Sequence, residues 1–286
     1  MNKNLKISIV GLGNMGIGIY KRLTENGFTI YGYDKKTSNN KLIPKHLINN
    51  IDKILSSSDL IFFAVPSNKE ISSIINKKNI KENAILIDLT TSDPKSTIKL
   101  HKKLQLQNIH YYDAAMSGGA TGAINGTLTL MIGAKQNELK SIENIFATMA
   151  SNVFYYGEPG TGHLMKLLHN SVCHGIFMMM CEVGNLAEES GISIKDLINT
   201  FNCSNARSYI SQERFPNHIL NKKYNGRSII NNLQKDLNMA QNYSKTKRTS
   251  SHYITMTDDL LKNFDESLKN NDFTEIYKLW NKNINK

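Results

Sequence analysis

The stretch KISIVGLGNMGIGIYKRLTENGFTIYGYD, residues 6–34, decides the fold of this chain. Its first apolar run, residues 7–10, is typical of a buried strand, and the glycine-rich GLGNMG follows at residues 11–16. A helical pattern then extends to Gly27, a residue typical of a helix C-cap. A second apolar run, FTIYGYD, ends in Asp34. Strand, glycine turn, helix and strand in this order predict a βαβ unit.

The glycine turn matches the pattern G-x-G-x-x-G, which is a weak signal by itself. Here it follows a strand and opens a helix, and Asp34 stands 23 residues after Gly11. Glycines let the backbone approach a pyrophosphate, the helix offers free N–H groups, and a carboxylate can hold the adenosine ribose. We therefore predict a dinucleotide site, with a glycine turn that serves only packing as the alternative. Its predicted residues are Gly11, Leu12, Gly13, Asn14, Met15, Gly16 and Asp34.

The choice of cofactor depends on Asp34 and the two lysines that follow it. A carboxylate accepts hydrogen bonds from both ribose hydroxyls of NAD, whereas the 2′-phosphate of NADP brings a like charge against it. Lys35 and Lys36 could neutralise that phosphate, but lysine lacks the bidentate fork of arginine. We expect NAD(H) to be preferred and NADP(H) to be used as well.

Further apolar runs alternate with helical stretches up to about residue 157: DLIFFAVP, AILIDLT, IHYYDA and TLTLMIGA. This alternation predicts an α/β fold with a mostly parallel sheet and helices on both faces. Ligands lie at the carboxyl ends of parallel strands, where AVP and DLTTSDP occur. Val65, Pro66 and Thr91 are therefore candidate cofactor residues, although ordinary turns punctuated by proline are equally compatible.

Helical patterns dominate after residue 160, over roughly residues 161–190, 193–203, 207–220 and 228–247. We expect a dinucleotide-binding domain over residues 1–160 and an all-α domain over 161–286 that begins with a long interdomain helix. The core of that helix, SVCHGIFMMMCEVGNLAEESG, is apolar around much of its circumference, as in a helix covered by neighbours. Part of the cover is expected from another subunit, which predicts a homodimer or homotetramer.

The composition favours a protein with an ordinary solvated surface. The chain has 286 residues, of which 40% are hydrophobic and 21% charged, and its net charge is +11. The basic residues are scattered among many asparagines, with only short runs such as Lys245, Lys247 and Arg248. We therefore expect no nucleic-acid partner, because phosphate backbones are bound by clustered Lys and Arg. A general attraction for anionic substrates remains compatible with this charge.

Membrane, disulfide and metal sites are not indicated. No run approaches the roughly 20 apolar residues of a membrane span, and the first strand pattern begins without a cleavable hydrophobic region, so we expect a cytoplasmic protein. Cys173, Cys181 and Cys203 lack C-x-x-C spacing. The histidines at 163, 169 and 174 lack the i, i+4 spacing of a helical metal site, so we expect no metal and favour supporting roles for them.

Four blocks are distributed in order over most of the chain: GLGNMG (11–16), DAAMSGGATGAINGTLTLMIGA (113–134), GTGHLMKLLHN (160–170) and KDLNMA (235–240). Together they resemble the β-hydroxyacid dehydrogenases, which include 3-hydroxyisobutyrate dehydrogenase, tartronate semialdehyde reductase and, more distantly, 6-phosphogluconate dehydrogenase. The resemblance implies a Rossmann-like N-terminal domain, an all-α C-terminal domain and a substrate cleft between them.

The resemblance also implies roles for particular residues. Ser117, Gly118 and Gly119 match the SGG whose hydroxyl and N–H groups hold the substrate carboxylate. Lys166 matches the catalytic lysine, and Asn170 the asparagine that helps to bind and orient the substrate. Lys235, next to Asp236, matches the lysine that reaches the cofactor side.

These roles fit the chemistry of hydride transfer. Moving a hydride between nicotinamide C4 and a carbinol carbon requires a proton to move at the oxygen, and an apolar cleft favours a neutral, proton-accepting amine at Lys166. Asn170 lies one helical turn away and adds no charge. We expect an NAD(P)-dependent oxidoreductase that interconverts a small carboxylate-bearing 3-hydroxyacid and its semialdehyde. A dehydrogenase of a phosphorylated or sugar acid and a non-catalytic nucleotide-binding sensor are the alternatives.

The chain departs from the family pattern at four positions. Many relatives read DAPVSGG where this chain has Ala115 and Met116, which we expect to reshape the loop that holds the carboxylate. His169 before Asn170 resembles the 6-phosphogluconate branch, but Cys173 replaces the glutamate of that branch. Decarboxylating sugar-acid chemistry therefore loses a participant.

Overall fold

The computed structural model of the chain describes residues 5–36, 41, 43–48, 50–76 and 79–283. The chain forms two compact units, Met1–Lys166 and Leu167–Lys286, called here the N-terminal and the C-terminal unit. The division falls inside one helix, α8 (Thr161–Glu189), so a single helix carries residues of both units.

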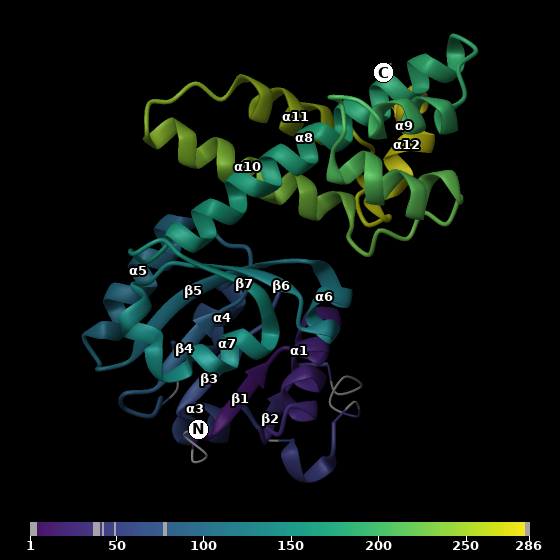
Figure 1. Cartoon of the computed structure of the whole chain (residues 1–286). Coiled ribbons are helices and arrows are strands. Elements are labelled where there is room, and N and C mark those ends of the chain that lie inside the picture. The colour runs from purple at the N-terminus through teal and green to yellow at the C-terminus, as the bar shows by residue number, and fades with distance from the viewer. Residues whose placement is uncertain (1–4, 37–40, 42, 49, 77–78, 284–286) are drawn as a thin grey trace. The chain divides into compact units, whose positions relative to one another are not determined.

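The described part of the N-terminal unit contains one seven-stranded sheet with the order β2-β1-β3-β4-β5-β6-β7 (Figure 1). The first five strands in this order are parallel to their neighbours. β5 and β6 are antiparallel, and β6 and β7 are parallel. The predicted, mostly parallel sheet is therefore confirmed. Its strands are β1 (Ile7–Val10), β2 (Ile30–Tyr33), β3 (Leu60–Phe63), β4 (Ile85–Asp88), β5 (His110–Ser117), β6 (Leu128–Ile132) and β7 (Ala150–Tyr155).

Helices bury both faces of this sheet, as the alternation of strands and helices predicted. Ile9 and Phe62 pack in a core with α1, α6 and α7, whereas Val10 and Phe63, the next residues along their strands, pack with α3, α4 and α5. Successive side chains of a strand point to opposite faces, so strands covered on both faces read as continuous apolar runs. The helices are α1 (Asn14–Glu25), α3 (Ile51–Ser57), α4 (Asn68–Ile75), α5 (Pro94–Gln105), α6 (Gly119–Asn125) and α7 (Glu143–Met149).

The register of the parallel strands brings their carboxyl ends to one edge of the sheet. Val10 pairs with both Tyr33 and Phe63, and Phe63 pairs with Asp88. The segments that follow β1, β2, β3 and β4 therefore leave the sheet side by side. This is the edge at which open parallel sheets bind ligands.

Two features of the sheet differ from the sequence-based expectation. β7 was missed, because its sequence ASNVFY exposes several side chains at an edge of the sheet and lacks the apolar run of a buried strand. β5 also extends beyond the predicted run IHYYDA, through Ala115 and Met116, while the expectation that these two residues reshape the loop that follows stays a prediction. Both residues belong to β5 and pair with Met131 and Leu130 of β6, so this departure from the family pattern lies within a strand.

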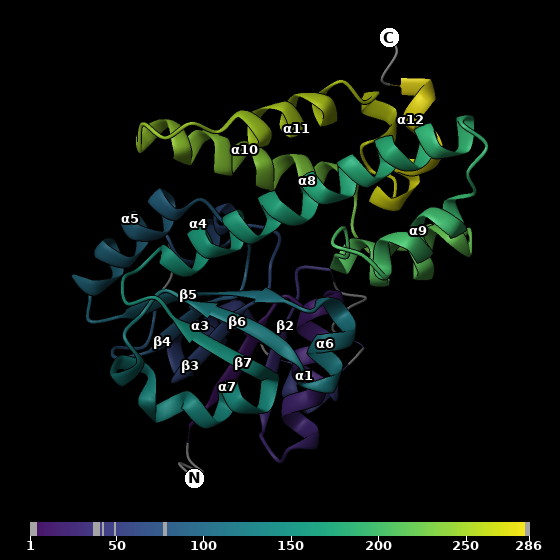
Figure 2. The same ribbon diagram turned by 45° about the horizontal axis from the view of Figure 1, so that its top comes forward.

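The C-terminal unit is helical, as predicted. α10 and α11 follow each other along the chain and lie side by side in both ribbon views (Figures 1 and 2). Its core contains edge-to-face aromatic pairs, with ring centroids 4.9 Å apart for Phe177 and Phe273 and 5.5 Å apart for Phe215 and Tyr277. Besides α8, its helices are α9 (Ile194–Asn202), a π-helix (Ile210–Leu220), α10 (Ile230–Thr246), α11 (His252–Lys262) and α12 (Ile276–Asn283).

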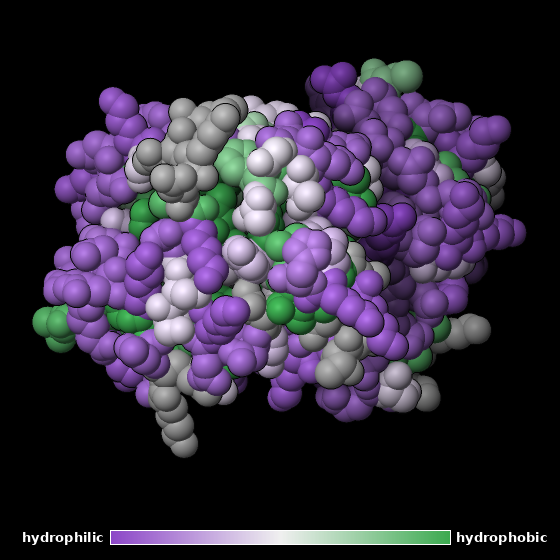
Figure 3. Space-filling view, turned by 90° about the horizontal axis from the view of Figure 1, so that it is seen from below, coloured by the Kyte–Doolittle hydropathy of each residue, from purple (hydrophilic) through white to green (hydrophobic). Residues whose placement is uncertain are grey.

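The surface is predominantly polar on the face in Figure 3, where hydrophobic side chains are exposed only in small areas. Within the described residues, no helix combines the length and apolar character that crossing a membrane requires.

Candidate active site

The glycine turn at the end of β1 has a geometry that excludes side chains at two positions. Gly11 has φ +96°, and its N–H donates to the carbonyl oxygen of Tyr33 at 2.8 Å. A Cβ at Gly16 would lie 1.9 Å from the carbonyl oxygen of Gly11. Gly13 differs, because apart from its own local backbone and chain neighbours no described atom lies within 4 Å of a Cβ placed there. Gly11 and Gly16 therefore shape the turn, and Gly13 leaves open space beside it.

This open space lies at the N-terminus of α1. Gly13 is the N-cap, and the described part of the chain provides no side-chain hydrogen bond to cap the helix. The first amides of a helix have no intrahelical acceptor, and the helix dipole adds partial positive charge there. Gly13 and Asn14 are exposed, while Met15 is half-buried. The turn therefore fits a pyrophosphate, which the sequence predicted.

Asp34 follows β2 and lies beside the glycine turn. Its Oδ2 accepts the N–H of Leu12 at 2.7 Å, and its Oδ1 accepts the N–H of Lys36 at 2.7 Å. These bonds hold the carboxylate in place beside the glycine turn. The side chains of Lys35 and Lys36 are exposed next to it. The arrangement fits the adenosine ribose of a dinucleotide.

The ends of β3 and β4 lie at the same edge. A Cβ at Gly11 would approach the carbonyl oxygen of Ala64 to 2.4 Å and Cγ1 of Val65 to 3.1 Å, so the ends of β1 and β3 are in close contact. Pro66 is exposed, and Val65 and Thr91 are half-buried. The structure therefore brings these candidates to the edge that carries the glycine turn and Asp34.

The Ser117 turn, residues 117–119, lies at the end of β5. This strand continues beyond the parallel part of the sheet and pairs antiparallel with β6 as far as Ser117. Gly118 and Gly119 have φ values of +125° and +62°, a region that favours glycine. Ser117 is half-buried and both glycines are exposed, so the turn lies partly at the surface.

Lys166 and Asn170 both lie on α8, in the N-terminal and the C-terminal unit respectively. Because the helix is continuous from Thr161 to Glu189, their spacing of four residues places them on the same face. Lys166 is half-buried, and Asn170 is 8% exposed.

The side chain of Asn170 is oriented by contacts within the C-terminal unit. Its Nδ2 donates to Oδ2 of Asp236 at 2.6 Å, and its Oδ1 lies 2.9 Å from Nδ1 of His169. Nζ of Lys235, on α10, lies 3.7 Å from Oδ1, the other carboxylate oxygen of Asp236. The motifs around residues 170 and 235 are therefore brought together by direct hydrogen bonding.

Two of the residues that depart from the family pattern contact each other. Nε2 of His169 lies 3.8 Å from Sγ of Cys173. His174 is near Asp236 instead, with its Nε2 3.8 Å from Oδ2. Among the residues described by the structure, no group of three or more His, Cys, Asp or Glu side chains could hold a metal ion.

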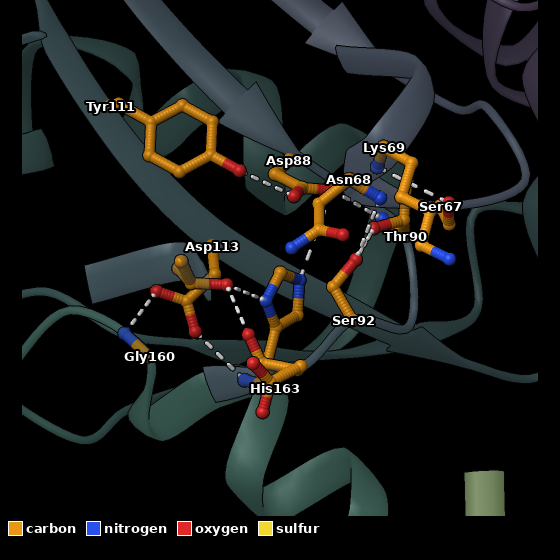
Figure 4. A network of polar contacts seen from close by, with 12 residues as sticks. Ser67, Asn68, Lys69, Asp88, Thr90, Ser92, Tyr111, Asp113, Gly160 and His163 are labelled. Carbon is orange, nitrogen blue, oxygen red and sulfur yellow. Dashed lines mark hydrogen bonds and ion pairs between the residues drawn. The ribbon is translucent and has the colours of Figure 1, made fainter. Parts of the chain in front are cut away.

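A buried polar network in the N-terminal unit joins β4, β5, α5 and the first turn of α8 (Figure 4). It contains Asp88, Asp113 and His163, all completely buried, and Tyr111. Burial raises the pKa of the Tyr111 phenol well above its usual value, so the phenol keeps its proton and donates a hydrogen bond to Asp88. Burial also raises the pKa of the Asp113 carboxyl. The nearby His163 and the backbone N–H groups that donate hydrogen bonds to this carboxyl partly lower it again.

Sequence reasoning assigned no role to Asp88 or Asp113. The available signal was an aspartate inside an apolar strand, which is costly to bury without hydrogen-bond donors. His163 received only a general supporting role, and the structure shows which groups it contacts. Its Nδ1 lies 2.8 Å from Oγ1 of Thr97.

Comparison with known protein families decides the identity. Residues 6–157 match the family model of the NAD-binding domain of 6-phosphogluconate dehydrogenase. Residues 160–280 match the model described as NAD-binding of NADP-dependent 3-hydroxyisobutyrate dehydrogenase. The chain belongs to the β-hydroxyacid dehydrogenase family. It is therefore an NAD(P)-dependent oxidoreductase of this family, as the resemblance of the four sequence blocks implied.

Similar proteins of this family include two hydroxyacid dehydrogenases. The chain is 26% identical over 254 residues to 2-(hydroxymethyl)glutarate dehydrogenase of Eubacterium barkeri, which covers 84% of this chain and 82% of that protein. It is 28% identical over 263 residues to mitochondrial 3-hydroxyisobutyrate dehydrogenase of Rattus norvegicus, covering 87% and 78%. The fold resembles that of Mycobacterium tuberculosis 3-hydroxyisobutyrate dehydrogenase, solved with L-serine, with a TM-score of 0.87, 19% identity and coverage of 96% and 99%.

Proposed function

We propose that this β-hydroxyacid dehydrogenase interconverts a small 3-hydroxyacid and its semialdehyde, with Lys166 as the acid/base. One observation carries the proposal. The amine of Lys166 and the Ser117 turn belong to α8 and β5, two elements that hydrogen bond to each other through Asp113. An amine and a carboxylate-binding turn on connected elements are suited to a substrate that carries a hydroxyl group near a carboxylate.

The names of the relatives define the proposed substrate class more closely. 3-Hydroxyisobutyrate and 2-(hydroxymethyl)glutarate both carry a hydroxymethyl group on the carbon next to a carboxylate, and they differ in the other substituent of that carbon. We assign the common carboxylate to Ser117, Gly118 and Gly119, whose hydroxyl and amides can donate charge-assisted hydrogen bonds to it. The second substituent then distinguishes one substrate from another.

In the oxidative direction the substrate loses a hydride from carbon and a proton from oxygen, and in the reductive direction it regains both. When bound, the nicotinamide takes or supplies the hydride. In the oxidative direction the neutral Nζ of Lys166 accepts the proton of the substrate hydroxyl as the carbonyl forms, and in the reductive direction Lys166 returns it. Asn170, held by Asp236 and His169, hydrogen bonds the substrate without adding a charge. Lys235 is assigned to the cofactor side.

A substrate panel followed at the nicotinamide absorbance tests this proposal. The panel contains 3-hydroxyisobutyrate, 2-(hydroxymethyl)glutarate, L-serine, the semialdehydes of the first two, and 6-phosphogluconate, each with both cofactors. We expect turnover with at least one 2-substituted 3-hydroxypropanoate. Turnover confined to 6-phosphogluconate would support the sugar-acid alternative. No turnover together with tight cofactor binding would support a non-catalytic sensor.

The cofactor prediction concerns Asp34. We expect kcat/KM to be higher with NAD(H) than with NADP(H), because the carboxylate held by Leu12 and Lys36 accepts ribose hydroxyls and repels a 2′-phosphate. Asp34→Ala should reduce the difference in kcat/KM between the two cofactors, because it weakens NAD(H) binding and removes the repulsion of the 2′-phosphate. Steady-state kinetics with both cofactors measure the two effects.

Lys35 and Lys36 provide the matched control for this prediction. Both side chains are exposed, so replacing both with alanine should lower activity with NADP(H) and leave activity with NAD(H) nearly unchanged. A wild-type preference for NADPH of about tenfold or more, which corresponds to about 1.4 kcal/mol, would show that the two lysines outweigh Asp34.

The assembly prediction concerns an apolar row on α8. Leu168, Val172, Met179 and Leu186 are 47%, 62%, 50% and 65% exposed, and their spacings of four and seven residues place them along one face of the helix. We propose that a second copy of the chain covers this row, in a homodimer or homotetramer closed by two-fold symmetry. Light scattering at micromolar concentration should give at least twice the mass of one chain.

Val172→Glu should shift this assembly toward the monomer, because it places a charge in the covered row. Leu106→Glu is the control, since Leu106 is 89% exposed in the N-terminal unit, away from α8 in the sequence. A monomeric wild-type mass would contradict the assembly prediction. An equal effect of both variants would show that the apolar row is not the contact surface.

A further inference from the structure

The first turn of α8 is fixed to β5 by one carboxylate. Oδ1 of Asp113 accepts the N–H of Gly160 at 2.7 Å, and Oδ2 accepts the N–H of His163 at 2.7 Å (Figure 4). Asp113 and His163 are completely buried. A carboxylate at a helix N-terminus satisfies free amides and is favoured by the helix dipole. Asp113 therefore caps α8 from a different element of the fold.

Glycines allow the helix to approach the sheet closely enough for this contact. A Cβ at Gly162 would lie 2.2 Å from the carbonyl oxygen of Met131, and a Cβ at Gly133 would lie 2.3 Å from Oδ1 of Asp113. The first turn of α8 thus packs directly against backbone at the end of β6. Because there is no room for a side chain at either place, the turn has little freedom to shift.

His163 provides a second anchor for the same turn. Its Nδ1 lies 2.8 Å from Oγ1 of Thr97 on α5, and its Nε2 lies 3.8 Å from Oδ1 of Asp88 at the end of β4. His163 and Thr97 are completely buried. The first turn of α8 is thereby tied to β5 and α5 by hydrogen bonds and placed beside β4.

Asp113 links the two elements that carry groups of the proposed active site. Four residues further along β5 is Ser117, and three residues beyond His163 on α8 is Lys166. We propose that Asp113 is a positioning residue that sets where the amine of Lys166 stands relative to the Ser117 turn, by holding the first turn of α8 to β5. The proposal rests on the proposed function of Lys166. It predicts that loosening this joint slows the chemical step without removing any group that contacts the substrate.

Asp113→Asn tests the proposal. Asparagine has one carbonyl oxygen for the two N–H groups and turns an NH₂ group toward the other, so the helix must shift or lose a bond. We expect kcat to fall by about tenfold to a hundredfold, because misplacement of about 1 Å costs up to about 10²-fold. Cofactor affinity should change by less than about twofold, since the glycine turn is untouched. The isotope effect on kcat with cofactor deuterated at C4 should rise, because the chemical step becomes slower.

Tyr111→Phe is the matched control. It removes a hydrogen bond to Asp88 from the same buried network but leaves both bonds of Asp113 to α8 in place. We expect this variant to have a lower Tm but a wild-type kcat and isotope effect. Loss of folded protein alone lowers the measured rate in both variants and leaves the isotope effect and the pH profile of kcat unchanged.

The outcomes distinguish a positioning role of Asp113 from a purely structural one. A folded Asp113→Asn enzyme with kcat within about twofold of wild type, or with an unchanged isotope effect, overturns the proposal. If that variant does not fold, Thr97→Val decides. It loosens the second anchor of the same helix turn, which Tyr111→Phe leaves intact, and an unchanged kcat and isotope effect would show that the position of this turn does not set the rate, which also overturns the proposal. If Lys166→Ala keeps its activity, it is the proposed function that fails.

Discussion

Lys166→Ala is expected to lower kcat by about 10²–10⁴-fold, the usual contribution of a general acid or base. The substitution removes the amine proposed to exchange a proton with the substrate oxygen. Cofactor affinity should stay nearly unchanged, because the glycine turn and Asp34 lie on other elements of the fold. Steady-state kinetics at the optimal pH and a cofactor titration measure the two quantities.

Two controls test whether the loss of turnover comes from the amine of Lys166 itself. Lys195→Ala removes an exposed lysine from α9 and should leave kcat unchanged. Added ethylamine should partly restore turnover to Lys166→Ala, because a free amine can take over a proton transfer but cannot repair a misfolded site. A loss smaller than about tenfold would remove Lys166 from its assigned role.

Gly16→Ala and Gly13→Ala are expected to abolish tight cofactor binding for different reasons. A Cβ at Gly16 would lie 1.9 Å from the carbonyl oxygen of Gly11, so Gly16→Ala must distort the turn and should lower both Tm and cofactor affinity. A Cβ at Gly13 meets no described atom within 4 Å, so Gly13→Ala should keep the Tm of wild type. Its methyl group occupies the open space assigned to the pyrophosphate, and we expect Kd to rise by about tenfold to a hundredfold.

The pair of variants separates folding from binding. Thermal unfolding measures the first, and fluorescence titration with NADH measures the second. If Gly13→Ala binds NADH as tightly as wild type, the pyrophosphate does not lie against Gly13, and the assignment of the turn is wrong. A wild-type Tm for Gly16→Ala would show that the turn can relax around a side chain.

Where the prediction from the sequence was accurate, a local pattern carried the information. The apolar runs at residues 7–10 and 60–63 predicted buried strands, since side chains on both faces of a covered strand are apolar. The glycine turn and Asp34 were recognised from their spacing, because strand, turn and helix are contiguous in the chain. The family followed from blocks of this kind, and the family models confirm it.

Local patterns failed where a segment lies at an edge or changes its partner. β7 has a mixed sequence with several exposed side chains, so it lacks the continuous apolar run by which the other strands were found. The predicted run IHYYDA ended at Ala114, but β5 continues through Ala115 and Met116 by pairing with β6. Pairing of this kind depends on a neighbouring strand that the local sequence does not reveal.

The amino-acid sequence by itself determined the βαβ start, the alternation of strands and helices, the helical second half and the family. These properties depend on residues that are close together in the chain. Only the tertiary structure placed Asp113 against Gly160 and His163, which are 47 and 50 residues away, and brought Thr97 to His163. Such contacts depend on how α8 packs against β5 and α5, and no periodicity within a single segment encodes them, because both partners satisfy their hydrogen bonds only after the elements have assembled.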